Sequence, residues 1–218
     1  MSGLPQSPPP PFADDTTAAY SGYVGAARAS TIPDGVGFWP RAGARIIDSI
    51  VHTLAGLVTG VILGVMAAVA TAAAGGDFDA LAAKLDRSSP LDYVIGFLGF
   101  LAYHTICEGL HGSSLGKMLL GQVVVTDQVQ PCGLPAAFKR NLAYLVDALF
   151  FGAIGYMEMK KTRLAKRHGD NWAGTFVARR SQVPMGILRG TGRFLGVLLL
   201  ALAVDSAILM AYFAVKMM

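Results

Sequence analysis

A long apolar run over residues 46–74 constrains this chain more than any other feature of its sequence. About 20 apolar residues in a helix are enough to cross the hydrocarbon core of a bilayer, because a helix rises by about 1.5 Å per residue. Asp48 and His52 are the only residues of the run that can ionise. Charged residues make up 15% of the whole chain, whereas soluble domains carry about 25%. The sequence therefore predicts an integral membrane protein.

Two further apolar segments, residues 91–108 and 194–215, also predict membrane-spanning helices because of their length. A third segment, residues 141–159, is interrupted by Gly152 and Gly155. The expected fold class is therefore all-α and integral to the membrane. It consists of a helical bundle of about three spans with a re-entrant or fourth helix in addition.

The distribution of positive charge bears on the third apolar segment. Residues 158–193 hold nine of the 18 lysines and arginines of the chain. The positive-inside rule places this segment and residues 109–140 in the cytoplasm, and the acidic connection at residues 75–92 outside. A single crossing cannot put both of its flanks on one side. We therefore favour a re-entrant hairpin, which is tolerated where its backbone is buried in protein, over a full fourth span.

The remaining segments predict a small ribbon and three regions of the chain. Residues 122–126 and 175–178 are rich in the β-branched or aromatic residues typical of strands, and their pairing would form a small extramembrane β-ribbon. Residues 1–36 form a Pro-rich tail that is expected to be disordered. Residues 37–180 form the main membrane domain, and residues 181–218 form a basic linker and a C-terminal transmembrane helix.

An arginine and an aspartate seven residues apart occur twice, as Arg41 with Asp48 and as Arg140 with Asp147. On a helix, this spacing puts both side chains on nearly one face, about 10 Å apart along the axis. Each copy leads into an apolar run, where a lone ionised carboxylate is unfavourable. We therefore expect the two helices to pack as neighbours, with Asp48 paired to a group of the second copy, or the converse. In the alternative interpretation, each aspartate only holds two helices together.

Other ionisable residues fall within the predicted spans. Asp48 and His52 are four residues apart in the first span, and so are His104 and Glu108 in the second. Residues with this spacing share a helix face, so the four groups suit a proton path or a divalent-cation site. Structural roles are the commoner explanation of such pairs, and no metal is assigned. Asp205 lies near the centre of the last span, where an ionisable residue is a candidate functional site.

Several sequence blocks belong together: Phe38-Trp-Pro-Arg41 with Asp48, Ser114-Leu-Gly-Lys117, Arg140 with Asp147, and Arg167-His-Gly-Asp170 before Ala173-Gly-Thr175. Over residues 36–180, they resemble the RDD family of prokaryotic membrane proteins, which is named for an Arg and two Asp residues. The last block is the most specific, although His168 replaces the usual aliphatic residue.

The resemblance implies that Arg41 and Asp48 are the family's Arg and first Asp, and that Asp147 or Asp170 is the second. It also implies a membrane module. Transport of unidentified ligands has been proposed for the family, and sodium/proton exchange is associated with some members. From the turn residues around it, we expect Asp170 to accept backbone N–H bonds before Ala173.

Two functions of different classes fit the sequence. The first is a non-enzymatic scaffold or accessory subunit. The second is a cation- or proton-coupled transporter, in which Asp48, Asp147 and Asp205 would bind the cation or proton. No nucleophile and base are visible together, so neither an enzyme nor a cofactor is expected.

Partners and location follow from the same features. The bilayer is the first expected partner, and anionic lipids would bind the basic segment 158–193. The Pro-rich tail suits a protein partner. A ridge of small residues, Gly56, Gly60, Gly64 and Ala68, suits close helix packing, either within one chain or between the copies of a homo-oligomer. No nucleic acid is expected. The predicted location is the inner (plasma) membrane, crossed several times, with the N-terminus in the cytoplasm.

Overall fold

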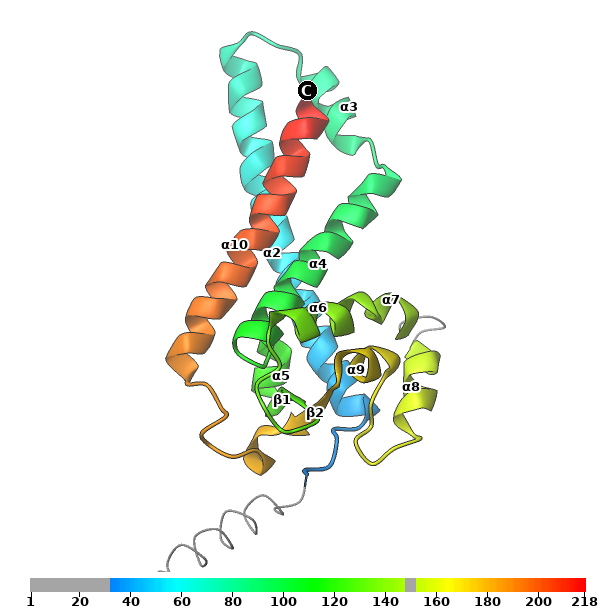
Figure 1. Ribbon diagram of the computed structural model, residues 1–218. Coiled ribbons are helices and arrows are strands. Elements are labelled where there is room, and N and C mark those ends of the chain that lie inside the picture. Colours follow the sequence, from blue (N-terminus) through cyan, green and yellow to red (C-terminus); the bar gives the residue numbers. More distant parts are fainter. Residues whose placement is uncertain (1–31, 148–151) are drawn as a thin grey trace, which may run out of the picture. The chain divides into compact units, whose positions relative to one another are not determined.

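Three long helices dominate the fold (Figure 1). The computed structural model describes residues 32–147 and 152–218, and the chain divides into the units Met1–Ile32 and Pro33–Met218. Helices α2 (Phe38–Ala73), α4 (Pro90–Leu110) and α10 (Thr191–Met217) are each long and apolar enough to cross a membrane. Helix α10 packs against both α4 and α2. The prediction of a helical membrane protein with three spans is therefore confirmed.

Local sequence determines where these helices begin and end. At the end of α2, Gly76 N–H donates to Thr71 O and Gly75 N–H donates to Ala72 O, with Gly75 at a φ of 63°. This is a Schellman motif, and glycine suits it because the left-handed conformation strains other residues. Helix α4 begins with a capping box, in which Ser89 and Asp92 bond to each other's backbone N–H groups.

The outer surface of α2 is apolar. Leu57 and Val65 are 61% and 58% exposed, which suits lipid and would be unfavourable in water. In the described part of the chain, no atom lies within 4 Å of a Cβ added at Gly56, Gly60 or Gly64. The predicted ridge of small residues is thus not used to pack helices of this chain against one another. Its glycines are open to contact from outside the described part of the chain.

The two predicted strands pair as an antiparallel ribbon, which confirms that prediction. Strand β1 (Gln122–Thr126) lies against β2 (Thr175–Arg179), with Val124 opposite Val177. Both faces of the ribbon are buried, one against Val36 and the other against Val183. Because hydrogen-bonded strands lie together, the segments that precede and follow residues 141–159 meet at one end of the long helices (Figure 1).

The folded unit starts earlier than predicted. Val36 N–H donates to Val177 O at 2.8 Å, and Gly35 forms a bridge with Ala178. Gly35 and Val36, which the sequence assigned to the tail, therefore extend the ribbon. The predicted disorder of the preceding residues falls on residues 1–31, outside the described part of the chain. At the other end, α10 belongs to the same unit as the rest of the membrane helices.

The third apolar segment is broken into short helices. Helix α6 (Leu134–Leu142) ends before a turn at Ala143, and α7 (Tyr144–Asp147) and α8 (Ala153–Met159) follow. Among the described residues of segment 141–159, no helix is long enough to cross a membrane. Re-entry of this segment, or a fourth span, stays a prediction. The other short helices are α3 (Phe78–Asp86), α5 (Leu115–Leu119), α9 (His168–Ala173) and the 3-10 helix η2 (Arg180–Gln182).

Candidate functional site

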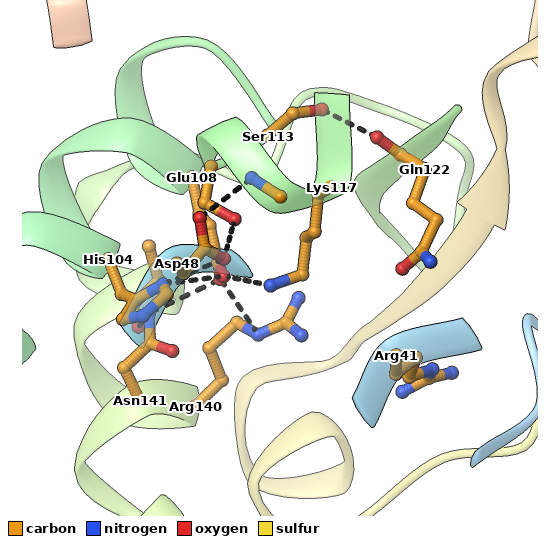
Figure 2. Close-up of polar contacts among 12 residues, drawn as sticks. Arg41, Asp48, His104, Glu108, Ser113, Lys117, Gln122, Arg140 and Asn141 are labelled. Atoms are coloured by element: carbon orange, nitrogen blue, oxygen red, sulfur yellow. Dashed lines mark hydrogen bonds and ion pairs between the residues drawn. The ribbon is translucent and has the colours of Figure 1, made fainter. Parts of the chain in front are cut away.

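Buried ionisable side chains gather where α2 and α4 meet the short helices (Figure 2). Four of the predicted site residues on these elements, Asp48, His104, Glu108 and Arg140, have no exposed surface. Asp170 is also fully buried, and Arg41 is 8% exposed. The structure thus brings six of the predicted residues into one network, which links α2, α4, α6 and α9.

Asp48 is held by groups from α4 and α5. Its Oδ2 accepts from Ser114 Oγ at 2.6 Å, and its Oδ1 accepts from Gly116 N at 2.7 Å and Tyr103 Oη at 3.1 Å. A Cβ added at Gly116 would lie 2.0 Å from Ala44 O. Glycine is therefore required for α5 to approach α2 closely enough to donate to Asp48.

Glu108 joins α4 to α5 and α6. Lys117 Nζ donates to its Oε1 at 2.6 Å, and Asn141 Nδ2 donates to its Oε2 at 3.2 Å. Arg140 Nε forms an ion pair with the same Oε2 at 3.3 Å. Burial lowers the pKa of Lys117, although the attraction of Glu108 acts in the opposite direction. Burial also acts to lower the pKa of Arg140, but the carboxylates around it raise that pKa above its usual value.

His104 lies between the two carboxylates. Its Nδ1 is 3.7 Å from Glu108 Oε1 and 4.0 Å from Asp48 Oδ2. In the described part of the chain, neither ring nitrogen has a hydrogen-bond partner. The ring packs edge-on against Phe100 and Tyr103, with centroids 4.4 Å and 5.0 Å away. His104 is thus close to both charges but bonded to neither.

Asp170 connects the arginines of the two Arg–Asp copies. Arg41 NH1 donates to its Oδ2 at 2.6 Å, and Arg140 NH2 lies 3.0 Å from its Oδ1. Arg167 N–H also donates to Oδ2, at 3.1 Å, so the predicted backbone contact of Asp170 is confirmed. Burial acts to raise the pKa of Asp170, but Arg140, Arg167 and Arg41 outweigh burial and hold it well below its usual range.

Asp147 binds the first residues of α9. His168 N–H and Gly169 N–H donate to its two oxygens at 3.2 and 3.3 Å, and Arg167 Nε lies 3.8 Å away. A Cβ on Gly169 would lie 2.5 Å from Arg140 O, so only glycine permits this close approach of α9 to α6.

The predicted pairing between the two Arg–Asp copies is wrong. Among the described residues, Asp48 bonds to α4 and α5 and Asp147 bonds to α9, so neither aspartate bonds to the other copy. The copies also differ in form, since Arg41 and Asp48 share one helix whereas a turn separates Arg140 from Asp147. Among the described residues, the first arginine of each copy instead binds Asp170, and Arg45 of the first copy stacks over Tyr144 of the second, 4.3 Å from its ring centroid.

The remaining predicted residues lie apart from this network. His52 Nδ1 on α2 is 3.0 Å from Asp205 Oδ2 on α10, and Thr59 bonds to Ser206 at 3.0 Å between the same helices. The predicted set of Asp48, His52, His104 and Glu108 is therefore divided, with His52 in a separate pair. Among the described residues, no group of three or more His, Cys, Asp or Glu side chains is placed to hold a metal ion.

Sequence reasoning missed several members of the network. Lys117, Tyr103 and Asn141 bond to its carboxylates, but none was proposed as a site residue. Lys117 and Ser114 belong to the Ser-Leu-Gly-Lys block that carries the family resemblance. Their place in this block was the sequence signal that could have identified them as members of the network. Tyr103 stands one residue before His104 in a span that was examined only for ionisable residues four apart.

Together, the long helices, the ribbon and the buried network define a polytopic helical membrane protein whose spans are connected to its short elements by arginine–carboxylate pairs. The RDD family model matches residues 36–174, so the chain belongs to the RDD family. Searches of curated proteins and of solved structures found no match. The matched region contains α2, α4 and the network, whereas β2 and α10 lie beyond it.

Proposed function

We propose that this RDD-family protein acts as a membrane scaffold or accessory subunit without enzymatic activity. In this proposal, the Arg–carboxylate network holds the ribbon and short helices rigidly against the ends of α2 and α4. The module would then present a fixed surface to another component at one end of the membrane helices.

One observation carries the proposal: both oxygens of each central carboxylate are already engaged by groups of the protein. Asp48 accepts three hydrogen bonds, Glu108 binds a lysine, an asparagine and an arginine, and Asp170 binds two arginines and a backbone N–H. A site that binds and releases cations needs carboxylate oxygens that are free for part of the cycle. The saturated contacts favour a structural role, in which breaking any pair would leave a buried charge.

A flux measurement tests the proposal directly. The purified protein is reconstituted into vesicles with an entrapped pH dye, and sodium or pH gradients are imposed. We expect no flux above that of protein-free vesicles. The matched variant is Asp48→Asn, examined as monodisperse protein. A flux in the wild type that this folded variant abolishes would refute the scaffold proposal.

A specific observation favours the second candidate function, a cation- or proton-coupled transporter. The His52–Asp205 pair lies inside the apolar helices, and a Cβ added at Gly99 of α4 would meet Asp205 Oδ1 at 2.0 Å, so the three long helices converge there. Two protonatable groups at such a position suit a proton-binding site. In the same vesicles, a flux that Asp205→Asn abolishes and Asp48→Asn preserves would support this candidate.

The proposed setting of the protein rests on charge and composition. The N-terminus and residues 158–193 would face the cytoplasm of a cell with the protein in its inner membrane. The basic segment would contact anionic lipid, and the Pro-rich tail would bind a protein partner. A homo-oligomer would use the outward ridge of α2, which no other helix of the described chain covers.

A further inference from the structure

A cavity of about 340 Å³ lies beside the buried network. Its volume falls within the range of small-molecule sites, roughly 300–1,000 Å³. Five cationic side chains line it, from α2, α5, α6 and the loop before α9: Arg41, Arg45, Lys117, Arg140 and Arg167. Figure 2 shows the cationic ends of Lys117 and Arg140 side by side. Asp147 is the one acidic side chain among the described residues that line the cavity.

The charges around the cavity do not balance. The five cations face four buried carboxylates, which are Asp48, Glu108, Asp147 and Asp170. Arg41, Lys117, Arg140 and Arg167 each lie within 4 Å of one of these carboxylates. In the described structure, Arg45 forms no ion pair. Its guanidinium instead stacks over Tyr144 and Phe100, 4.3 and 4.7 Å from their ring centroids. One positive charge is therefore left without an anionic partner.

Among the described residues, two buried arginine donors at the cavity have neither a hydrogen-bond partner nor an ion pair. Arg140 is completely buried, yet its NH1 has no hydrogen-bond partner in the described part of the chain. Arg45 NH1 is buried and unpartnered in the same way. Buried donors of charged groups are rarely left unpaired, because desolvating them is unfavourable. Both residues line the same cavity, so a single acceptor there can serve both.

We propose that this cavity binds a phosphate group, with Arg45 and Arg140 as its principal donors. The planar guanidinium fork matches the spacing of phosphate oxygens, and charge-assisted contacts of this kind are strong. The remaining wall is apolar and includes Phe38, Ile46 and Met159. The ligand is therefore either free phosphate or the headgroup of an anionic phospholipid whose chains follow that wall. Bound phosphate would neutralise the unbalanced charge of Arg45.

The test uses thermal unfolding of the full chain in an uncharged detergent, with four additives. Sodium phosphate is compared with sodium chloride at equal ionic strength, and dioctanoyl phosphatidylglycerol is compared with dioctanoyl phosphatidylcholine. We expect phosphate, the anionic lipid or both to raise Tm saturably. Stabilisation by phosphate alone identifies a soluble ligand, and stabilisation by the lipid alone identifies a headgroup. The proposal would be overturned if neither phosphate nor the anionic lipid had a saturable effect, or if the two lipids stabilised the protein equally while phosphate had no effect.

Variants localise the binding to the cavity. Arg45→Gln removes the unpaired cation without breaking an ion pair and should weaken binding at least tenfold. Arg87→Gln makes the same change at an exposed arginine beyond α3 and should bind as the wild type does. Should Arg45→Gln fail to fold, Ala42→Leu narrows the cavity with no change of charge and should also weaken binding. Unchanged affinity in a folded Arg45→Gln or Ala42→Leu protein would exclude the cavity as the site.

Discussion

Replacement of Asp170 by asparagine should destabilise the protein more than any other conservative change in the network. Asp170 is fully buried, and it is the shared partner of Arg41 at 2.6 Å and Arg140 at 3.0 Å. Asparagine keeps the size of the side chain but removes its charge. It also turns one acceptor into a donor that faces an arginine. Arg41 would then lose its only ion pair in the described structure, and Arg140 would keep only Glu108.

Removal of one partner from a buried ion pair is unfavourable by about 3–5 kcal/mol. Since 1 kcal/mol shifts Tm by roughly 2–4 °C in a domain of this size, the expected loss is about 6–20 °C. Asp34→Asn is the matched control, because Asp34 pairs with Arg163 at 3.3 Å and both side chains are more than 60% exposed. Exposed pairs contribute only about 0–1 kcal/mol, so this variant should lose less than about 4 °C.

The assay is thermal unfolding of both purified variants in the same detergent, together with their yield of monodisperse protein. Asp170→Asn should also give the lower yield. Equal Tm values for Asp170→Asn and the wild type would refute the reasoning. So would a well-folded Asp170→Asn protein that had lost a measurable transport activity, because the assigned role of Asp170 is structural.

Three further predictions concern acid stability, energetic coupling and topology. Because the native pKa of Asp170 is depressed, its ionised form stabilises the fold above about pH 4. This contribution is lost as the pH falls toward the native pKa. The Tm of the wild type should therefore exceed that of Asp170→Asn by less at pH 3 than at pH 5. Asp48→Asn and Asp147→Asn should each lower Tm. In the double variant, the two changes in the free energy of unfolding should add, because the two aspartates share no donor among the described residues. A clear departure from additivity would support the contact between the copies that the repeat predicts. A cysteine at Ser88 should react with an impermeant reagent added outside intact cells, whereas one at Ser181 should not, and labelling at Ser181 would contradict a cytoplasmic basic segment.

Some elements of the fold were predictable because their signals are local. Long apolar runs specify α2, α4 and α10, and runs of β-branched residues specify β1. Residues 141–159 were interpreted as one membrane segment because their composition is apolar. Composition does not show that Asn141 bonds to Glu108 and that Asp147 binds α9 across a turn. Those contacts exist only after the chain has folded.

The sequence could not predict which charged side chains pair in the network, for a related reason. A repeated Arg–Asp spacing predicts that two helices meet, and it does not reveal that a third element carries the carboxylate for both arginines. Asp170 was expected to contact its own turn, since Asp near Gly and Asn favours local backbone bonds. That local bond exists. The longer contacts depend on Gly169, whose close approach to Arg140 is visible only in three dimensions.

The position of Asp170 in the chain has a consequence for biosynthesis. Arg41 precedes its partner by 129 residues. At a synthesis rate of about 5–20 residues per second, roughly 6–26 s pass before that carboxylate leaves the ribosome. During this interval α2 and then α4 are completed, yet the arginine at the head of α2 lacks its counterion. A chain that enters a bilayer while it is being made must keep this guanidinium in contact with water until α9 arrives. Helices α2 and α4 can therefore insert before Asp170 joins the charged end of the bundle, and α10 is made only afterwards.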